Sequence, residues 1–264
     1  MRARPWPAWT IRRQAWAPEG VTVLITGGTK GIGLAIARRL ALSHDRLVLA
    51  YHSDEASADA ARAEITALGA TVQTVRTDVG NLEGVAALMA QVGGLTHIVH
   101  SAAMIYPTTL LGADMVRFRQ AVETNGLSLL YLVHAAQDLL DRGSSVVFIT
   151  SMGSRIPSPN YGALGVGKAL AEAIIRYLVA ELAPRGIRIN GVAPGLVHTT
   201  SVAAMVGGEA AAQAVVDRAA RTNPSGRESR DSDYAALVEF LLSREAEFIQ
   251  GQVIAATGGT GVIG

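Results

Sequence analysis

The sequence contains no cysteine, which excludes disulfide bonds, thiolate catalysis and cysteine-ligated zinc. An excess of charge of one sign is also lacking. The 23 Lys and Arg residues nearly balance the 22 Asp and Glu residues, and the net charge of +1 does not indicate a nucleic-acid partner. The six histidines lack the spacing of metal ligands, and no apolar run reaches the roughly 18 residues of a membrane helix. We therefore expect a cytoplasmic protein without a metal site or a membrane span.

What is present indicates one large core. Hydrophobic residues make up 49% of the 264 residues and charged residues only 17%, which suits a single α/β domain over residues 21–264. Residues 1–20 differ, because they hold all three tryptophans, four arginines and three prolines. They lack the apolar stretch that a signal peptide requires. We expect a flexible extension, the alternative being an arm that packs on a partner subunit or a membrane surface.

From Val21 onward, short β-branched runs alternate with longer segments of helical period. The predicted strands are 21–26, 46–51, 71–77, 96–101, 145–151, 187–193 and 251–256. The predicted helices are 31–42, 55–68, 82–92, 114–141, 161–183, 202–221 and 231–243. Strands that are apolar on both faces and separated by helices predict a doubly wound, parallel, seven-stranded sheet of the Rossmann type, with helices on both faces. Such sheets bind ligands beyond the carboxyl ends of their strands.

The first strand leads into TGGTKGIG (26–33), which the helical run LAIARRLAL follows. Glycines allow a tight turn and close approach of a phosphate, and the helix N-terminus supplies unpaired N–H groups. Its position between the first strand and the first helix makes this loop a predicted dinucleotide site. The similar TGGTGVIG (257–264) has no helix after it and is interpreted as a tail after the last strand.

The end of the second strand bears on the choice of dinucleotide. NAD sites usually carry an acid there that binds the ribose hydroxyls, but Tyr51 holds that place. Lys30 puts a cation near the expected 2′-phosphate, and His52 and Ser53 add donors, so NADP(H) is favoured over NAD(H). Lys30 can equally be a solvated loop residue. Asp78, after the third strand, can meet the adenine amino group or simply shape a turn.

Four features together resemble the short-chain dehydrogenase/reductases: TGGTKGIG, the Asp78-Val79 pair, Asn125 in the fourth helix, and PRGIRINGVAPGLVHT (184–199). The resemblance covers about residues 21–257. One departure is HSAA (100–103), where the family often has Asn-Asn-Ala-Gly. His100 and Ser101 can still bond across strands, so we expect a small effect on the end of the sheet.

In that family a Ser, a Tyr and a Lys carry catalysis, and the Tyr stands four residues before the Lys. Lys168 and Ser151 match the pattern, but Leu164 occupies the tyrosine position. Tyr161, seven residues before Lys168, gives a spacing that resembles the enoyl-acyl carrier protein reductases. IRYLVAEL (175–182) and RTNPSGR (221–227) resemble their NADPH-dependent branch. On a helix, seven residues back is only ~20° from the lysine's face, so Tyr161 can share it.

The resemblance implies an NADPH-dependent enzyme that reduces the C=C bond of an enoyl thioester, as in fatty-acid or polyketide-type biosynthesis. The acyl group of this substrate would be carried on acyl carrier protein or coenzyme A. It implies a homotetramer or homodimer and a substrate lid at about 201–222. The implied catalytic residues are Tyr161, Lys168, Ser151 and Asn125. The implied cofactor-binding residues are Gly27, Thr29, Lys30, Gly31, Ile32, Gly33, Tyr51, His52, Ser53, Asp78, Val79, Ser101, Ala102, Lys168, Pro194, Gly195, Val197 and Thr199.

Two alternatives stay open. Tyr161 can serve a carbonyl or imine substrate of secondary metabolism, because a displaced tyrosine does not oblige a C=C substrate. Leu164 can instead mark an inactive site, which would leave an NADP(H)-binding sensor or scaffold in which Tyr161 is a packing residue at a helix start.

Overall fold

The structure, a computed structural model, describes residues 20–261. The prediction for residues 1–20 lies outside this range apart from Gly20. The strands are β1 Thr22–Thr26, β2 Arg46–Tyr51, β3 Thr71–Arg76, β4 His97–His100, β5 Ser145–Ile149, β6 Arg188–Pro194 and β7 Val253–Ala256. The helices are α1 Gly31–Leu40, α2 Glu55–Ala67, α3 Leu82–Val92, α4 Met115–Val122, α5 Ser128–Ala135, α6 Gly162–Leu182, α7 Thr200–Val206, α8 Glu209–Thr222 and α9 Asp231–Leu242, with short turns η1 Glu123–Leu127, η2 Met152–Ser154, η3 Ala183–Arg185 and η4 Arg244–Ala246.

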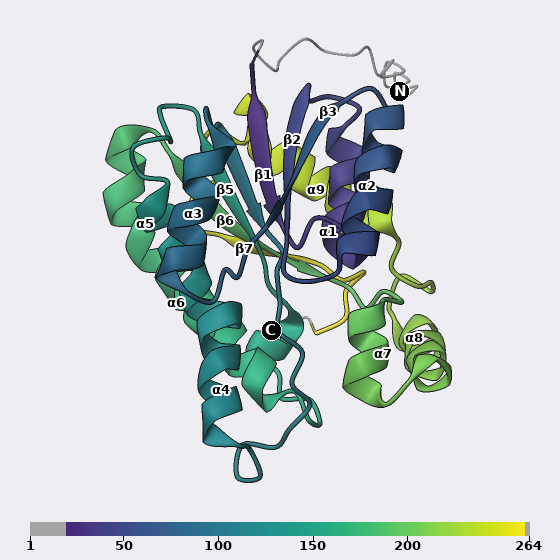
Figure 1. Ribbon diagram of the computed structural model, residues 1–264. Helices are drawn as coiled ribbons and strands as arrows, with labels where there is room; N and C mark the ends of the chain where they lie inside the picture. Colours follow the sequence, from purple (N-terminus) through teal and green to yellow (C-terminus); the bar gives the residue numbers. More distant parts are fainter. Residues whose placement is uncertain (1–19, 262–264) are drawn as a thin grey trace, which may run out of the picture.

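The seven strands form one parallel sheet, as the sequence predicts, and their order is β3-β2-β1-β4-β5-β6-β7. The order reverses between β1 and β4, where the chain crosses from one half of the sheet to the other. In Figure 1 the strands run downward, so their carboxyl ends face the lower part of the molecule, where α4, α7 and α8 lie. This reversal and these strand ends are where a doubly wound sheet binds its ligand.

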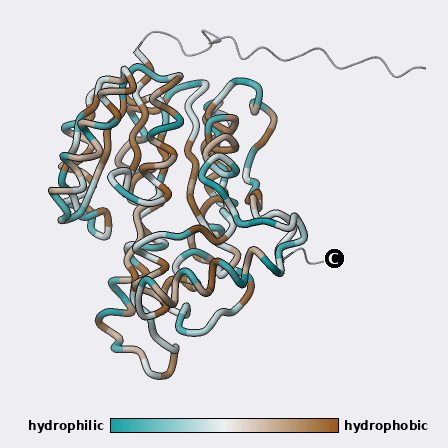
Figure 2. The backbone as a smooth tube through the Cα atoms, turned by 90° about the vertical axis from the view of Figure 1, so that its right-hand side faces the viewer, coloured by the Kyte–Doolittle hydropathy of each residue, from teal (hydrophilic) through white to brown (hydrophobic). Residues whose placement is uncertain are grey.

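Two apolar cores lie on opposite faces of the sheet. One packs α1, α2 and α9 against side chains such as Ile25, Leu47 and Val147. The other packs α3, α5 and α6 against Leu24, Phe148 and their neighbours. The central strands are therefore hydrophobic along their length, as the brown tubes in Figure 2 show. The rigid sheet fixes where each loop at its carboxyl end begins.

Two predicted helices differ from the structure. The segment 114–141 is not one α-helix, because a π turn at Glu123–Leu127 separates α4 from α5 and regular helix ends at Ala135. The segment 202–221 is two helices, because Gly207 and Gly208 have φ values of 96° and 131°, which break the helix between α7 and α8. Both departures lie beside the carboxyl ends of the strands.

Candidate active site

The glycine-rich loop forms a cradle at the carboxyl end of β1. Gly27 and Gly31 have positive φ values of 64° and 53°. A Cβ on Gly33 would lie 2.1 Å from the carbonyl oxygen of Gly27, and a Cβ on Gly27 would lie 2.9 Å from Ala102, so neither position admits a side chain without rearrangement. Lys30 begins α1 without a side-chain cap, which leaves first-turn N–H groups for an anion. Thr29 is buried and Ile32 packs against the core.

A carboxylate does stand near the end of β2, although not where the sequence analysis looked for it. Asp54 Oδ2 lies 3.1 Å from Lys30 Nζ. Asp54 also caps α2, where it accepts hydrogen bonds from the Ser57 hydroxyl and backbone N–H. These hydrogen bonds from Ser57, followed by that from Lys30, lower the pKa of Asp54 to about 2. Tyr51 is half-buried, and His52 and Ser53 are exposed beside this ion pair.

Asp78 shapes a turn after β3. Its Oδ1 accepts a hydrogen bond from Gly80 N at 2.8 Å, and its Oδ2 accepts one from Asn81 Nδ2 at 3.1 Å. Val79 is buried next to it. The turn interpretation of Asp78 is therefore correct, while contact with adenine stays a prediction. Arg76, which the sequence analysis missed, donates from Nε to the His52 carbonyl and adds a cation at this edge.

His100 bonds across strands, as predicted. Its Nδ1 lies 2.6 Å from Thr26 Oγ1, and its Nε2 lies 2.7 Å from Ser128 Oγ. Burial, followed by the charge of Lys168, lowers the pKa of His100 to about 3, so the ring is neutral near pH 7. Ser101 N and Ala102 N donate to the backbone oxygen and hydroxyl of Thr26. This network joins the end of β4 to the glycine-rich loop.

Asn125 lies in the π turn and is fully buried. Its Oδ1 accepts from Met104 N and its Nδ2 donates to Met104 O, both at 2.9 Å. A Cβ on Gly167 would lie 2.6 Å from Asn125 Cβ, so the π turn presses directly on α6. Asn125 thus ties the loop after β4 to the helix that carries Lys168. Its predicted contact with ordered water stays a prediction.

Tyr161 caps the start of α6 and is brought to Ser151 by the turn after β5. The Ser151 hydroxyl lies close enough to the phenol to affect its pKa. Burial raises the pKa of the Tyr161 phenol, and the Ser151 hydroxyl opposes this effect. The ring lies against Gly153, where a Cβ would meet ring carbons at 2.4 and 2.6 Å. Only glycine leaves room for the ring there. Leu164 is buried at 5% exposure, so the usual tyrosine position points into the protein.

Lys168 lies two turns further along α6 and is almost fully buried. Its Nζ donates to the Ile149 carbonyl at 2.7 Å and lies 4.4 Å from the centre of the Phe148 ring. Burial lowers the pKa of Lys168 from 10.5 to about 7. At neutral pH the charged and neutral forms of this amine are therefore both populated, and strongly shifted pKa values are common among functional lysines.

The end of β6 completes the site. Gly195 N donates to Ala256 O, and Val197 is buried after the half-buried Pro194. Thr199 caps α7, and its methyl group would lie 3.7 Å from a Cβ on Gly31. This contact brings the segment after β6 next to the glycine-rich loop, although the two are far apart in sequence. The predicted lid region starts directly after Thr199 as the α7–α8 pair.

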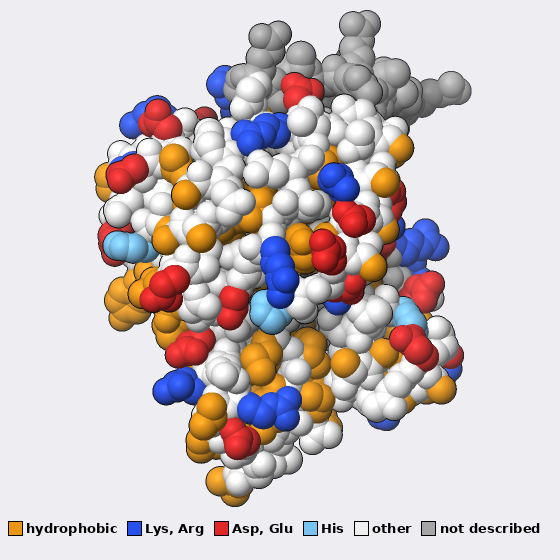
Figure 3. All heavy atoms as spheres, viewed as in Figure 1, with side chains coloured by type: hydrophobic (Ala, Val, Ile, Leu, Met, Phe, Trp, Pro, Cys, Tyr) orange, Lys and Arg blue, Asp and Glu red, His pale blue; other side chains and the backbone are white. Residues whose placement is uncertain are grey.

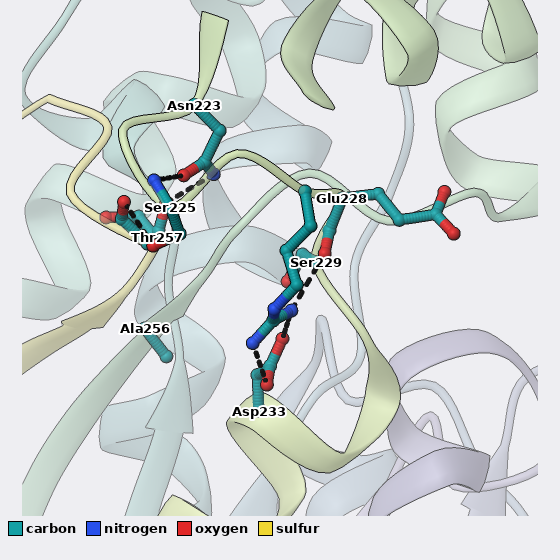
Figure 4. Close-up of a pocket in the computed structure, with 9 residues that line it drawn as sticks. Asn223, Ser225, Glu228, Ser229, Asp233, Ala256 and Thr257 are labelled. Atoms are coloured by element: carbon teal, nitrogen blue, oxygen red, sulfur yellow. Dashed lines mark hydrogen bonds and ion pairs between the residues drawn. The ribbon is translucent and has the colours of Figure 1, made fainter. Parts of the chain in front are cut away.

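Two hollows open at this end of the molecule. One, of about 350 Å³, is lined by Thr29, Lys30, Gly31, Leu34, Arg38, Ser57, Ala60, Ala61, Glu64, His198, Thr199 and Asp231, and so contains the glycine-rich loop. The other, of about 200 Å³, lies between the end of β7 and the segment from α8 to α9, and none of the predicted catalytic residues lines it. Its wall includes Asp233, labelled in Figure 4, which accepts two hydrogen bonds from the Arg227 guanidinium. The first hollow is the one that belongs to the cofactor region.

The surface around the strand ends is partly apolar. Figure 3 shows hydrophobic side chains gathered over the lower part of the molecule. Leu110, Leu111, Met115 and Val116, in α4 and the loop before it, are more than half exposed. Among residues 20–261 no helix is long and apolar enough to cross a membrane, and no cluster of three or more His, Asp or Glu residues could hold a metal ion.

Comparison with known proteins identifies the family. The family model described as Enoyl-(Acyl carrier protein) reductase matches residues 27–261. An uncharacterized oxidoreductase of Methylorubrum extorquens is 34% identical over 91% of this chain and 98% of its own. A 1-cyclohexenylcarbonyl-CoA reductase of Streptomyces collinus is 31% identical over 95% of this chain and 90% of its own.

Solved structures of similar proteins have the same fold. A short chain dehydrogenase of Burkholderia cenocepacia in complex with NADP has a TM-score of 0.82 and 27% identity, over 92% of this chain and 98% of its own. A dehydrogenase/reductase of Sinorhizobium meliloti has a TM-score of 0.84 and 27% identity, over 95% and 98%. With the sheet order and the glycine-rich loop, these matches show that the chain belongs to the short-chain dehydrogenase/reductases, a superfamily of oxidoreductases, within the Enoyl-(Acyl carrier protein) reductase family.

Proposed function

We propose that the protein reduces the C=C bond of an α,β-unsaturated thioester with NADPH. The observation that carries this proposal is the placement of one phenol: Tyr161 stands at the start of α6 beside Ser151, while the usual tyrosine position is filled by the buried Leu164. In enoyl reduction hydride goes to the β-carbon, two atoms from the carbonyl carbon. The group that binds the carbonyl oxygen must therefore stand further from the nicotinamide than in ketone reduction.

The residues present fit a dinucleotide phosphate. The cradle has no room for side chains at Gly27 and Gly33, and Gly31 has a positive φ. The start of α1 offers N–H groups to a pyrophosphate. Lys30 supplies a cation for a 2′-phosphate, and Arg76 adds positive charge at the same edge. The NADP-bound relative from Burkholderia cenocepacia supports this choice. We propose the same role in cofactor binding for the other residues that the sequence analysis gives as implied cofactor-binding residues.

The chain's own groups then account for the chemistry. Bound NADPH supplies the hydride. The Tyr161 hydroxyl stays protonated at neutral pH because burial raises its pKa, and it donates a hydrogen bond to the thioester oxygen as negative charge develops there. Ser151 orients that hydroxyl. Lys168 binds the ribose and supplies positive charge below about pH 7. Tyr161 or water protonates the α-carbon.

The substrate enters beside α7 and α8, which we propose as the lid. The pair carries few buried side chains, among them Ala203, Ala212 and Val216, so its anchoring is light and closure over an acyl chain is feasible. A thioester carrier, either coenzyme A or acyl carrier protein, is supported by the name of the Streptomyces collinus relative. A homotetramer or homodimer is supported by exposed apolar residues on α5 and α6, such as Leu130 and Val166. We also propose a cytoplasmic location.

The test follows NADPH oxidation by the purified protein with crotonyl-CoA and, separately, with acetoacetyl-CoA. Tyr161→Phe is the test variant, and Tyr177→Phe is the control, because Tyr177 is an exposed tyrosine on the same helix. We expect oxidation with crotonyl-CoA only, lost in the first variant and kept in the second. Oxidation with acetoacetyl-CoA only would replace the proposal by carbonyl reduction. Tight NADPH binding without turnover of either would favour a binding protein.

A further inference from the structure

A buried carboxylate lies beneath the turn that carries Ser151. Glu172 is one helical turn after Lys168 on α6 and is only 4% exposed. Carboxylates are rarely buried to this extent unless they are paired, so its partners indicate what it stabilises. All three hydrogen-bond partners of its side chain come from one short segment, the residues just before and after Ser151.

The three contacts hold both ends of the turn. Thr150 Oγ1 donates to Glu172 Oε1 at 2.8 Å from the end of β5. Ser154 Oγ lies 2.6 Å from the same oxygen, and Arg155 Nε lies 3.1 Å from Oε2. Thr150 precedes Ser151, whereas Ser154 and Arg155 follow Gly153. One carboxylate therefore fixes the segment 150–155 to the helix that also carries Lys168.

The same turn sets the position of the phenol. Ser151 caps it by accepting a hydrogen bond from Gly153 N at 3.0 Å, and the Ser151 hydroxyl also lies close enough to Tyr161 to affect the pKa of the phenol. Gly153 has no side chain, which lets the Tyr161 ring lie directly against its backbone. A shift of the turn by a few tenths of an ångström would move both the Ser151 hydroxyl and the contact of Gly153 with the ring.

We propose that Glu172 is a positioning residue for the reaction: its carboxylate fixes the 150–155 turn, and through Ser151 and Gly153 it holds the Tyr161 hydroxyl where the substrate oxygen binds. This inference rests on the proposed role of Tyr161. It differs from an electrostatic role toward Lys168, because Lys168 Nζ bonds to Ile149 and its pKa is lowered by burial, with no contribution from Glu172.

The first test compares Glu172→Gln with Glu239→Gln. The control residue is a partly buried glutamate on α9 that likewise binds an arginine and a serine, Arg39 and Ser43, outside the site. In Glu172→Gln the amide keeps one acceptor but turns an NH₂ group toward Arg155. We expect kcat to fall about tenfold with KM for NADPH unchanged within about twofold, because a misplaced phenol slows the chemical step without weakening cofactor binding. The control keeps kcat.

The second test does not need turnover. Protein labelled with [¹³Cζ]tyrosine gives an NMR resonance for Tyr161, which Tyr161→Phe identifies by its loss. The ¹³Cζ shift reports the hydrogen bonding of the phenol, so Glu172→Gln should move or broaden this resonance and Glu239→Gln should not. An unmoved Tyr161 resonance would overturn the inference, as would equal losses of kcat, NADPH affinity and Tm in both variants. If the wild-type protein turns over neither thioester, the proposed function fails, and the resonance still decides the role of Glu172.

Discussion

Lys168→Met should stabilise the protein at neutral pH while removing its activity. Burial lowers the pKa of Lys168 from 10.5 to about 7. At 1.36 kcal/mol per pKa unit, holding the charged amine in the folded protein costs about 5 kcal/mol at low pH. Methionine keeps the apolar stem and has no charge. The substitution also loses the hydrogen bond to Ile149 and the contact with the Phe148 ring, together about 2 kcal/mol. We expect a net gain of about 2–3 kcal/mol at pH 7.

The sign of the pH dependence follows from the same pKa values. The unfolded wild-type chain keeps this proton up to about pH 10.5, whereas the folded chain releases it near pH 7. The free energy of unfolding of the wild type therefore rises with pH above 7, at up to ~1.4 kcal/mol per pH unit. The Lys168→Met variant lacks this contribution. The difference between the two proteins should accordingly close by about pH 9.

Urea denaturation of both proteins at intervals between pH 6 and pH 9 measures this difference directly, because all other titrating groups are shared. Turnover with crotonyl-CoA should fall by about 100-fold or more in the variant. A variant that is less stable than the wild type at pH 7 would refute the reasoning. So would a stability difference that stays constant from pH 6 to pH 9, because the buried lysine would then have an ordinary pKa.

Three further predictions concern the cofactor edge, the phenol and the buried histidines. Asp54→Asn removes the carboxylate that pairs with Lys30, which frees the lysine for the 2′-phosphate. NADPH binding should tighten up to about fivefold while NADH binding stays unchanged, as measured by fluorescence titration. Equal changes for both cofactors would contradict this. Gly153→Ala places a methyl group on the Tyr161 ring and should lower kcat at least tenfold, roughly as for other misplaced catalytic groups. Gly94→Ala is the control, because Gly94 likewise has no positive φ and a Cβ there would meet no atom within 4 Å. His97 and His100 have pKa values of about 3, mainly through burial. Their contribution to stability should be complete above about pH 6.5 and be lost as the pH drops below it, by up to ~1.4 kcal/mol per pH unit for each; a Tm that is flat between pH 6.5 and pH 4.5 would refute this.

Much of the fold was predictable from the sequence because its signals are local. Apolar runs such as those around Leu24 and Val147 separate helical periods, and this alternation requires a parallel sheet covered on both faces. The glycine-rich loop and Lys168 were equally visible, since their meaning depends on short spacings within one strand–turn–helix unit or one helix.

The departures have equally specific causes. Gly207 and Gly208 were visible in the sequence, but their consecutive left-handed conformations end α7 and start α8. The π turn around Asn125 was not visible, because it accompanies the close packing of Asn125 against Gly167 of another helix. Helical period alone does not report such a contact.

The chemistry of the site divides in the same way. The order of residues is enough to show that a tyrosine precedes Lys168 by seven positions and that a leucine fills the usual place. The folded chain is needed to show that Asp54 faces Lys30, that Gly153 lies against the Tyr161 ring, and that Glu172 bonds to the turn that carries Ser151. Each of these contacts joins residues on different elements, and their distances are set by how the helices pack on the sheet, which no local pattern of side chains encodes.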